Sequence, residues 1–184
     1  MALGLREFGE SRVQEAESKI SELGEGQRWH LVGHLQSNKA KRAVQLFEEI
    51  HSLDSPYLID ELARRAQDAN RSPRCYVELN TSGEATKHGV APGGALELLR
   101  LLQSASPLRA VGLMTIGPLE GGPDGARASF RTLARVRDEA RDRGLLGAEA
   151  ELSMGMSEDF EIAVEEGATI VRVGSALFGS RSAG

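Results

Sequence analysis

The chain contains the segments Glu151-Leu-Ser-Met-Gly-Met-Ser157-Glu-Asp159 and Ile170-Val-Arg-Val-Gly174-Ser175-Ala-Leu-Phe-Gly179. Each is a short apolar run that breaks into small residues, as a buried parallel strand does where it ends in a loop. Backbone N–H groups in such a loop can approach an anion closely, because small side chains leave them uncovered. The two segments therefore predict two neighbouring strands that end in a phosphate site, with an arginine beside it.

Similar apolar runs recur along the whole chain and alternate with segments of helical spacing. Strict alternation with short connections predicts parallel strands with helices outside them, either as an open doubly wound sheet or as a closed barrel. No Gly-x-Gly-x-x-Gly follows a first strand, so a dinucleotide-binding sheet has little support. A TIM-type (β/α) barrel has eight strands, whereas this chain offers about seven, so the residues alone leave both architectures open. The expected strands are residues 6–8, 29–32, 50–53, 75–79, 110–116, 150–154 and 169–173, and the expected helices are residues 13–23, 37–47, 57–69, 95–105, 125–143 and 157–166.

The composition predicts one soluble domain over residues 1–184, because 40% of the chain is hydrophobic and the length suits a single core. The net charge of -5 comes from interspersed acidic and basic residues, which disfavours a nucleic-acid partner. Cys75 is the single cysteine, which excludes an internal disulfide and favours a reducing, cytoplasmic setting. We expect no membrane span and no signal peptide, because no long apolar run is found.

The ends of the last two expected strands carry the strongest chemical signal. In a barrel of this kind the functional groups follow the strands, and the last two strands often build a phosphate site. Ser157, Gly174 and Ser175 can supply hydroxyl and backbone N–H donors there. If Arg172 points into the barrel, it can donate to a heteroaromatic nitrogen or to a carboxylate. Taken singly, these residues also have structural interpretations, with Ser157 as a helix cap, Gly174 as a turn and Arg172 as an ion-pair partner.

The other candidate residues carry weaker signals. His30 and His34 are four residues apart on a strand and a turn, so they do not reproduce the helical zinc motif, and we predict no metal site. We interpret His51 as structural. We predict no catalytic residue, because no serine lies in Gly-x-Ser-x-Gly and Cys75 lies inside an apolar run. We interpret Met154 and Met156 as packing residues, with a wall for a flat ligand as the alternative, under which Met154 is a cofactor-binding candidate.

Five ordered motifs span nearly the whole chain. They are Phe8-Gly-Glu-Ser-Arg-Val-Gln-Glu15, Trp29-His-Leu-Val-Gly-His-Leu-Gln-Ser-Asn-Lys39, Val111-Gly-Leu-Met-Thr-Ile-Gly117, Ser153-Met-Gly-Met-Ser-Glu-Asp-Phe160 and Val171-Arg-Val-Gly-Ser-Ala-Leu-Phe-Gly179. Together they resemble the pyridoxal phosphate homeostasis proteins. The resemblance implies a TIM-type (β/α) barrel like the N-terminal domain of alanine racemase, which holds pyridoxal 5′-phosphate (PLP). Compared with the family, this chain is expected to have about seven strands and to lack the first strand and the N-terminal helix. It also implies that Ser157, Gly174 and Ser175 bind the phosphate and that Arg172 faces the pyridine nitrogen. A permanent cation there disfavours protonation of that nitrogen, which makes the cofactor a poor electron sink.

Two departures from the family pattern affect the expected site. Family members have an earlier strand of the type Ala-Val-Ser-Lys, whose lysine bonds covalently to PLP, and nothing in residues 1–6 corresponds to it. The family's Gly-Glu-Asn is Gly9-Glu10-Ser11 here, so Ser11 replaces an amide near the ring edge. We therefore expect an N-terminally truncated chain with non-covalent or weak PLP binding. Lys87 is the candidate for a secondary covalent bond.

The resemblance makes a PLP-binding protein of intracellular PLP homeostasis the leading hypothesis, with cofactor buffering or delivery and no reaction of its own. A racemase-like PLP enzyme is one alternative, but it needs a lysine base and usually a second acid or base. A non-binding remnant or a barrel for another phosphate ester is the other alternative. The expected partners are PLP and PLP-dependent apo-enzymes. The chain is expected to be a monomer, or to self-associate through the open edge left by the missing strand.

Overall fold

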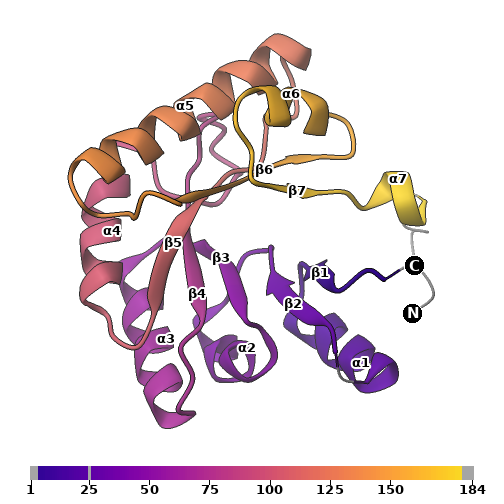
Figure 1. Ribbon diagram of the computed structural model, residues 1–184, viewed down its shortest axis with the longest axis vertical. Helices are drawn as coiled ribbons and strands as arrows, with labels where there is room; N and C mark the ends of the chain where they lie inside the picture. The colour runs from indigo at the N-terminus through magenta and orange to yellow at the C-terminus, as the bar shows by residue number, and fades with distance from the viewer. Residues whose placement is uncertain (1–3, 25, 180–184) are drawn as a thin grey trace.

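The computed structural model describes residues 4–24 and 26–179, and its seven strands form one parallel sheet. The strands pair in chain order from β1 to β7, so each βα unit adds one strand at the same side. The sheet curls into a barrel, with β1 and β7 at its two edges (Figure 1). The prediction of a seven-stranded TIM-type barrel is confirmed. The strands are β1 (Glu7–Glu10), β2 (Arg28–Leu31), β3 (Glu49–Leu53), β4 (Arg74–Glu78), β5 (Arg109–Met114), β6 (Glu151–Met156) and β7 (Ile170–Arg172).

Helices follow the strands and cover the outer face of the sheet (Figure 1). Local sequence explains several of their ends. Ser55 caps α3 by accepting a hydrogen bond from the Leu58 N–H at 3.4 Å, and Gly144 and Gly167, with φ of 68° and 90°, follow α5 and α6. Among the described helices, none is both long and apolar enough to cross a membrane. The helices are α1 (Val13–Leu23), α2 (Ala40–Leu46), α3 (Pro56–Asp68), α4 (Ala95–Ser104), α5 (Gly122–Asp142), α6 (Phe160–Glu165) and α7 (Ser175–Phe178), with 3-10 turns η1 (Ser37–Lys39) and η2 (Pro92–Gly94).

The segment after β6 differs from the sequence prediction. We expected a helix over residues 157–166, capped by Ser157, but α6 begins at Phe160. The reason is a tight turn in which the Met156 N–H donates to Asp159 Oδ1 at 2.6 Å. The hydroxyl of Ser157 is used elsewhere, beside the short helix α7, which the sequence did not predict. The structural interpretation of Ser157 as a helix cap was therefore wrong.

The strands separate an apolar outer layer from a polar interior. Leu31, Ile50, Val77, Leu113 and Leu152 belong to the hydrophobic core and are fully buried. Alternate side chains of a strand point to opposite faces, so the residues between these positions face the inside of the barrel. The inward set is polar and includes residues such as His30, His51 and Ser153.

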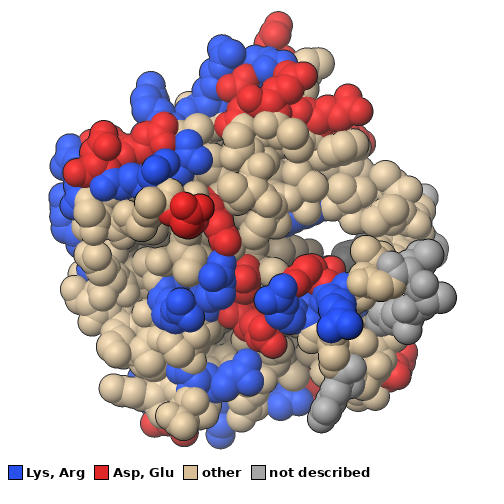
Figure 2. Space-filling model, viewed as in Figure 1, with Lys and Arg blue, Asp and Glu red and all other residues tan. Residues whose placement is uncertain are grey.

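On the face seen in Figure 2, acidic and basic side chains are interspersed rather than segregated.

Candidate functional site

Arg172 on β7 is held inside the barrel by two hydrogen bonds. Its Nη1 donates to Ser153 Oγ on β6 at 2.7 Å, and its Nη2 donates to the carbonyl oxygen of Thr115, just after β5, at 2.8 Å. Burial lowers the pKa of Arg172 to about 10, although Glu78 opposes this shift, so the side chain is a cation at neutral pH. The sequence left open whether this side chain points inward, and the structure places it inside.

Ser157 and the start of α7 form a convergent set of donors next to Arg172. The hydroxyl oxygen of Ser157 accepts hydrogen bonds from the N–H groups of Gly174 and Ala176, each at 3.2 Å. Two backbone donors that meet at one oxygen can also meet at an oxygen of a phosphate. Ser175 lies between them as the first residue of α7, and its side chain is exposed. The structure thus brings together Ser157, Gly174 and Ala176, with Ser175 between the last two in the chain. That Ser157, Gly174 and Ser175 bind a phosphate stays a prediction.

Glu78 at the end of β4 was missed by the sequence analysis. It is 4% exposed, and its Oε2 has no hydrogen-bond partner among the described residues. Burial and the nearby carboxylate of Asp54 raise the pKa of Glu78 to about 7, whereas Arg172 acts in the opposite direction. A buried polar atom without a partner is costly and is often explained by a ligand. The site therefore offers hydroxyl and N–H donors, a guanidinium and a carboxyl group with a free oxygen.

The ring of His51 contacts Ser153, the residue that accepts a hydrogen bond from Arg172. Its Nδ1 lies 2.9 Å from Ser153 Oγ, and it is fully buried. Burial lowers the pKa of His51 to about 4, so the ring is neutral at physiological pH. Arg172 and His51 thus both contact the hydroxyl oxygen of Ser153, so the buried ring helps to fix the acceptor of the guanidinium group. The alternation of polar and apolar residues in β3 and β6 could have predicted that His51 and Ser153 both face the inside of the barrel.

In the part of the chain that the structure describes, no hydrogen bond joins the side chains of the other three sequence-predicted residues to Arg172 or Ser157. Met154 is fully buried in the hydrophobic core, on the face of β6 opposite to Ser153, so the prediction that it lines the ligand cavity is wrong. Ser11 is exposed just after β1, with its backbone packed against Gly33. Lys87 forms an ion pair with Glu84 at 2.7 Å and donates to the Gly117 carbonyl, so its ammonium group is already engaged.

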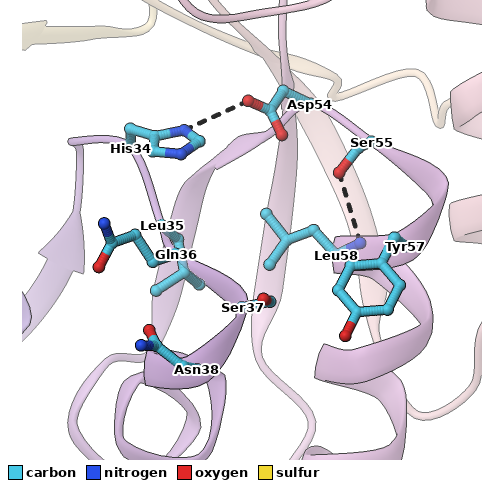
Figure 3. A pocket seen from close by; sticks show the side chains of 9 residues that line it. All are labelled: His34, Leu35, Gln36, Ser37, Asn38, Asp54, Ser55, Tyr57 and Leu58. Atoms are coloured by element: carbon cyan, nitrogen blue, oxygen red, sulfur yellow. Dashed lines mark hydrogen bonds and ion pairs between the residues drawn. The ribbon is translucent and has the colours of Figure 1, made fainter.

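A separate pocket lies at the ends of β2 and β3 (Figure 3). His34 Nδ1 lies 3.3 Å from Asp54 Oδ2 at its rim, and the rings of His34 and His88 stack with centroids 3.8 Å apart. The pocket continues along η1 to the Ser55 cap of α3. Asp54 links this pocket to the Arg172 site, because its carboxylate also acts on Glu78 at the end of β4.

Comparisons with known proteins agree with this geometry. Residues 1–182 match the family model for the alanine racemase N-terminal domain. The pyridoxal phosphate homeostasis protein of Aquifex aeolicus is 44% identical over 179 residues, which cover 97% of this chain and 78% of the relative. The corresponding protein of Schizosaccharomyces pombe is 37% identical, with 97% and 76% covered.

Solved structures show the same relationship. PipY of Synechococcus elongatus with PLP bound is 40% identical, with a TM-score of 0.87 over 97% of this chain and 84% of that chain. Alanine racemase of Clostridium difficile, at 14% identity and a TM-score of 0.80 over 97% of this chain and 46% of that chain, shares the fold. On the fold, the site and these similarities, the chain belongs to the family of pyridoxal phosphate homeostasis proteins.

Proposed function

We propose that this chain binds PLP, non-covalently or weakly, as a protein of intracellular PLP homeostasis, and that it catalyses no reaction. The observation that carries the proposal is the convergence of the Gly174 and Ala176 N–H groups on one oxygen, close to an arginine fixed inside the barrel. The family membership and the PLP-bound PipY structure support the choice of PLP over other phosphate esters.

The residues present fit the two ends of this cofactor. Ser157, Gly174 and Ser175 would hold the phosphate through hydroxyl and backbone N–H groups, with help from the Ala176 N–H. Arg172 would face the pyridine nitrogen, where its fixed positive charge disfavours a second one. The free oxygen of Glu78 is available to a further polar group of the ligand. When bound, PLP supplies a reactive aldehyde and a ring able to take up electrons.

The proposed absence of catalysis rests on the contacts that Lys87 and Arg172 already make within the protein. The ammonium group of Lys87 pairs with Glu84 and donates to the Gly117 carbonyl, so Lys87 is not free to act as a base. Hydrogen bonds to Ser153 and to the Thr115 carbonyl fix the guanidinium group of Arg172. Its positive charge would therefore stay beside the pyridine ring of bound PLP. A PLP enzyme such as a racemase needs the ring as an electron sink, and a cation at the nitrogen works against this. Racemisation of alanine by purified protein with PLP would overturn this part of the proposal.

Titration with three phosphate esters tests the binding part. Equilibrium dialysis of the purified chain against PLP, pyridoxine phosphate and a sugar phosphate should give the tightest binding for the two pyridine compounds. Arg172→Met should remove this preference, whereas Arg135→Met, on the outer helix α5, should leave it unchanged. Equal weak binding of all three esters by the unmodified chain would indicate a generic phosphate site instead.

A second experiment tests covalent capture. Borohydride reduction in the presence of PLP, followed by peptide mapping, reports any lysine that bonds to the aldehyde. We propose Lys87 as the secondary attachment point, at low yield because its ammonium group is engaged. An adduct on another lysine, or on none, contradicts the assignment to Lys87.

The proposed partners are PLP-dependent apo-enzymes and a second copy of the chain. Reactivation of an apo-enzyme by the PLP-loaded chain should be faster than by the same concentration of free PLP if delivery takes place. Sedimentation velocity over a range of concentrations distinguishes a monomer from self-association through the edge strands β1 and β7.

A further inference from the structure

Three potential metal-ligand atoms meet inside the barrel, on a pair of neighbouring strands. The parallel register of β2 and β3 sets His30 opposite Glu49, and His51 follows two residues later on the same face. His30 Nδ1 lies 3.1 Å from Glu49 Oε2 and 3.2 Å from His51 Nε2. His51 Nε2 lies 3.3 Å from Glu49 Oε2, which closes a nearly equilateral triangle. The spacing along the chain suggests only the pair of His30 and His34, because it is the sheet register that brings His30 next to Glu49.

The size of the triangle suits a transition-metal ion. Zn–N and Zn–O bonds of about 2.0–2.1 Å at tetrahedral angles place neighbouring ligand atoms about 3.3–3.4 Å apart. The observed separations of 3.1–3.3 Å need only a small expansion to reach this value. Two imidazoles with one carboxylate favour borderline ions such as Zn²⁺ over Mg²⁺ or Ca²⁺, which prefer oxygen ligands.

Each of the three side chains is also oriented by a second contact. His30 Nε2 lies 2.8 Å from Glu7 Oε2, and His51 Nδ1 lies 2.9 Å from Ser153 Oγ. Glu49 Oε1 accepts from Arg74 Nε at 2.7 Å. Metal-binding histidines typically use their second ring nitrogen in this way, which fixes the ring and makes the first nitrogen a better ligand.

The charge balance around the triangle is negative when both histidines are neutral. The carboxylates of Glu7, Glu49 and Glu151 face the guanidinium groups of Arg28 and Arg74. The group is largely buried: His51 is inaccessible, and the side chains of His30 and Glu49 are 12% and 13% exposed. An uncompensated charge is costly in such surroundings, so a bound cation would be stabilised.

We propose that His30, Glu49 and His51 form a binding site for one divalent ion of the zinc class, with three protein ligands and an open fourth position. The hydroxyl of Tyr76 donates to Glu49 Oε2, one of the three ligand atoms, at 2.9 Å. The site is independent of the proposed PLP function, although His51 joins it to Ser153 and hence to Arg172. The alternative occupant is a proton on His30, shared with Glu7 and Glu49.

Metal titration of the chelator-treated protein tests the proposal directly. We expect one Zn²⁺ per chain in competition with a chromophoric chelator, and no comparable binding of Mg²⁺. Co²⁺ should give intense visible absorption typical of four-coordination, which Zn²⁺ should abolish by displacement. Lack of stoichiometric Zn²⁺ and Co²⁺ binding would show that the proton occupies the triangle and would overturn the proposal.

Variants locate the ion. Glu49→Gln keeps the shape of the side chain but removes the charge, and it should weaken Zn²⁺ binding more than tenfold. Glu7→Gln changes only the second contact of His30 at a half-exposed position, so it should fold and should weaken binding by about tenfold or more. His34→Asn removes a histidine of the surface pocket and should leave Zn²⁺ affinity unchanged. The opposite pattern, with loss only in His34→Asn, would assign the ion to that pocket and refute the proposed site.

Discussion

The hydroxyl of Ser153 accepts a hydrogen bond from Arg172 at 2.7 Å, in the centre of the barrel. The same oxygen lies 2.9 Å from Nδ1 of His51, so one small side chain joins β3, β6 and β7. Because the three strands are fixed by the sheet, this contact sets where the guanidinium group lies. The position of the arginine is therefore a property of the whole barrel.

Replacing this hydroxyl should affect both stability and binding. Ser153→Ala removes a buried acceptor from Arg172 and a partner from His51, and we expect a loss of about 1–3 kcal/mol in the free energy of unfolding. PLP affinity should fall as well, because the arginine is less well positioned. Urea unfolding and equilibrium dialysis measure the two effects. Ser21→Ala, at an exposed hydroxyl on α1, is the matched control and should change neither.

The stability of the chain should depend on the protonation of Glu78. Burial, together with Asp54, raises the pKa of this carboxyl group from its ordinary 4.5 to about 7, so between these pH values the folded state holds a proton that the unfolded state has lost. Between these two pKa values stability therefore falls as the pH rises, by at most about 3 kcal/mol.

The variant Glu78→Gln tests this dependence. It should raise stability at pH 8 and should flatten the change in unfolding free energy between pH 5 and pH 7.5. Urea titrations at several pH values give both quantities. An unchanged slope in the variant would mean that other groups cause the pH dependence.

Gly155 in β6 should not tolerate a side chain. Its φ is 92°, and an added Cβ would lie 2.5 Å from the Cβ of Ala163 on α6. Strain in the backbone and overpacking of the helix each cost about 1–3 kcal/mol, so Gly155→Ala should destabilise the fold by about 2–5 kcal/mol. Gly147→Ala, where an added Cβ has no neighbour within 4 Å, should stay within about 0.5 kcal/mol of the unmodified chain in thermal or urea unfolding.

Cys75 should resist modification as long as the barrel is folded. It is fully buried on β4, and burial raises the pKa of its thiol to about 12, so very little thiolate is present at neutral pH. Labelling with a thiol reagent should therefore be slow in buffer and fast in urea. Rapid labelling of the folded chain would indicate that β4 opens locally.

The fold was predictable because its signals are local. Each strand is an apolar run of a few residues, and the stops at Gly144 and Gly167 are positions with positive φ that glycine adopts easily. All seven expected strands overlap strands of the structure. The prediction of secondary structure failed where contacts with other segments or turns set the conformation. One case is the turn closed by Asp159 before α6, and the other is α7, where the Ala176 N–H donates to Ser157.

The candidate site was predictable only in part. Ser157 and Gly174 were found because they follow strands in small-residue loops, and the structure brings them to within a hydrogen bond. Met154 was misplaced because one residue along a strand decides between the two faces of the sheet, and Ser153 takes the inner position.

Spacing along the chain predicted alternating parallel α/β units and the loops that end the last two strands, since apolar runs and glycine stops act over a few residues. It left an open sheet and a barrel both possible. Only the tertiary structure decided which polar side chains meet inside the barrel. His30, Glu49 and His51 come from two strands, and Ser153 and Arg172 from two others. Their contacts depend on strand register and barrel curvature, which are set by the packing of the whole sheet.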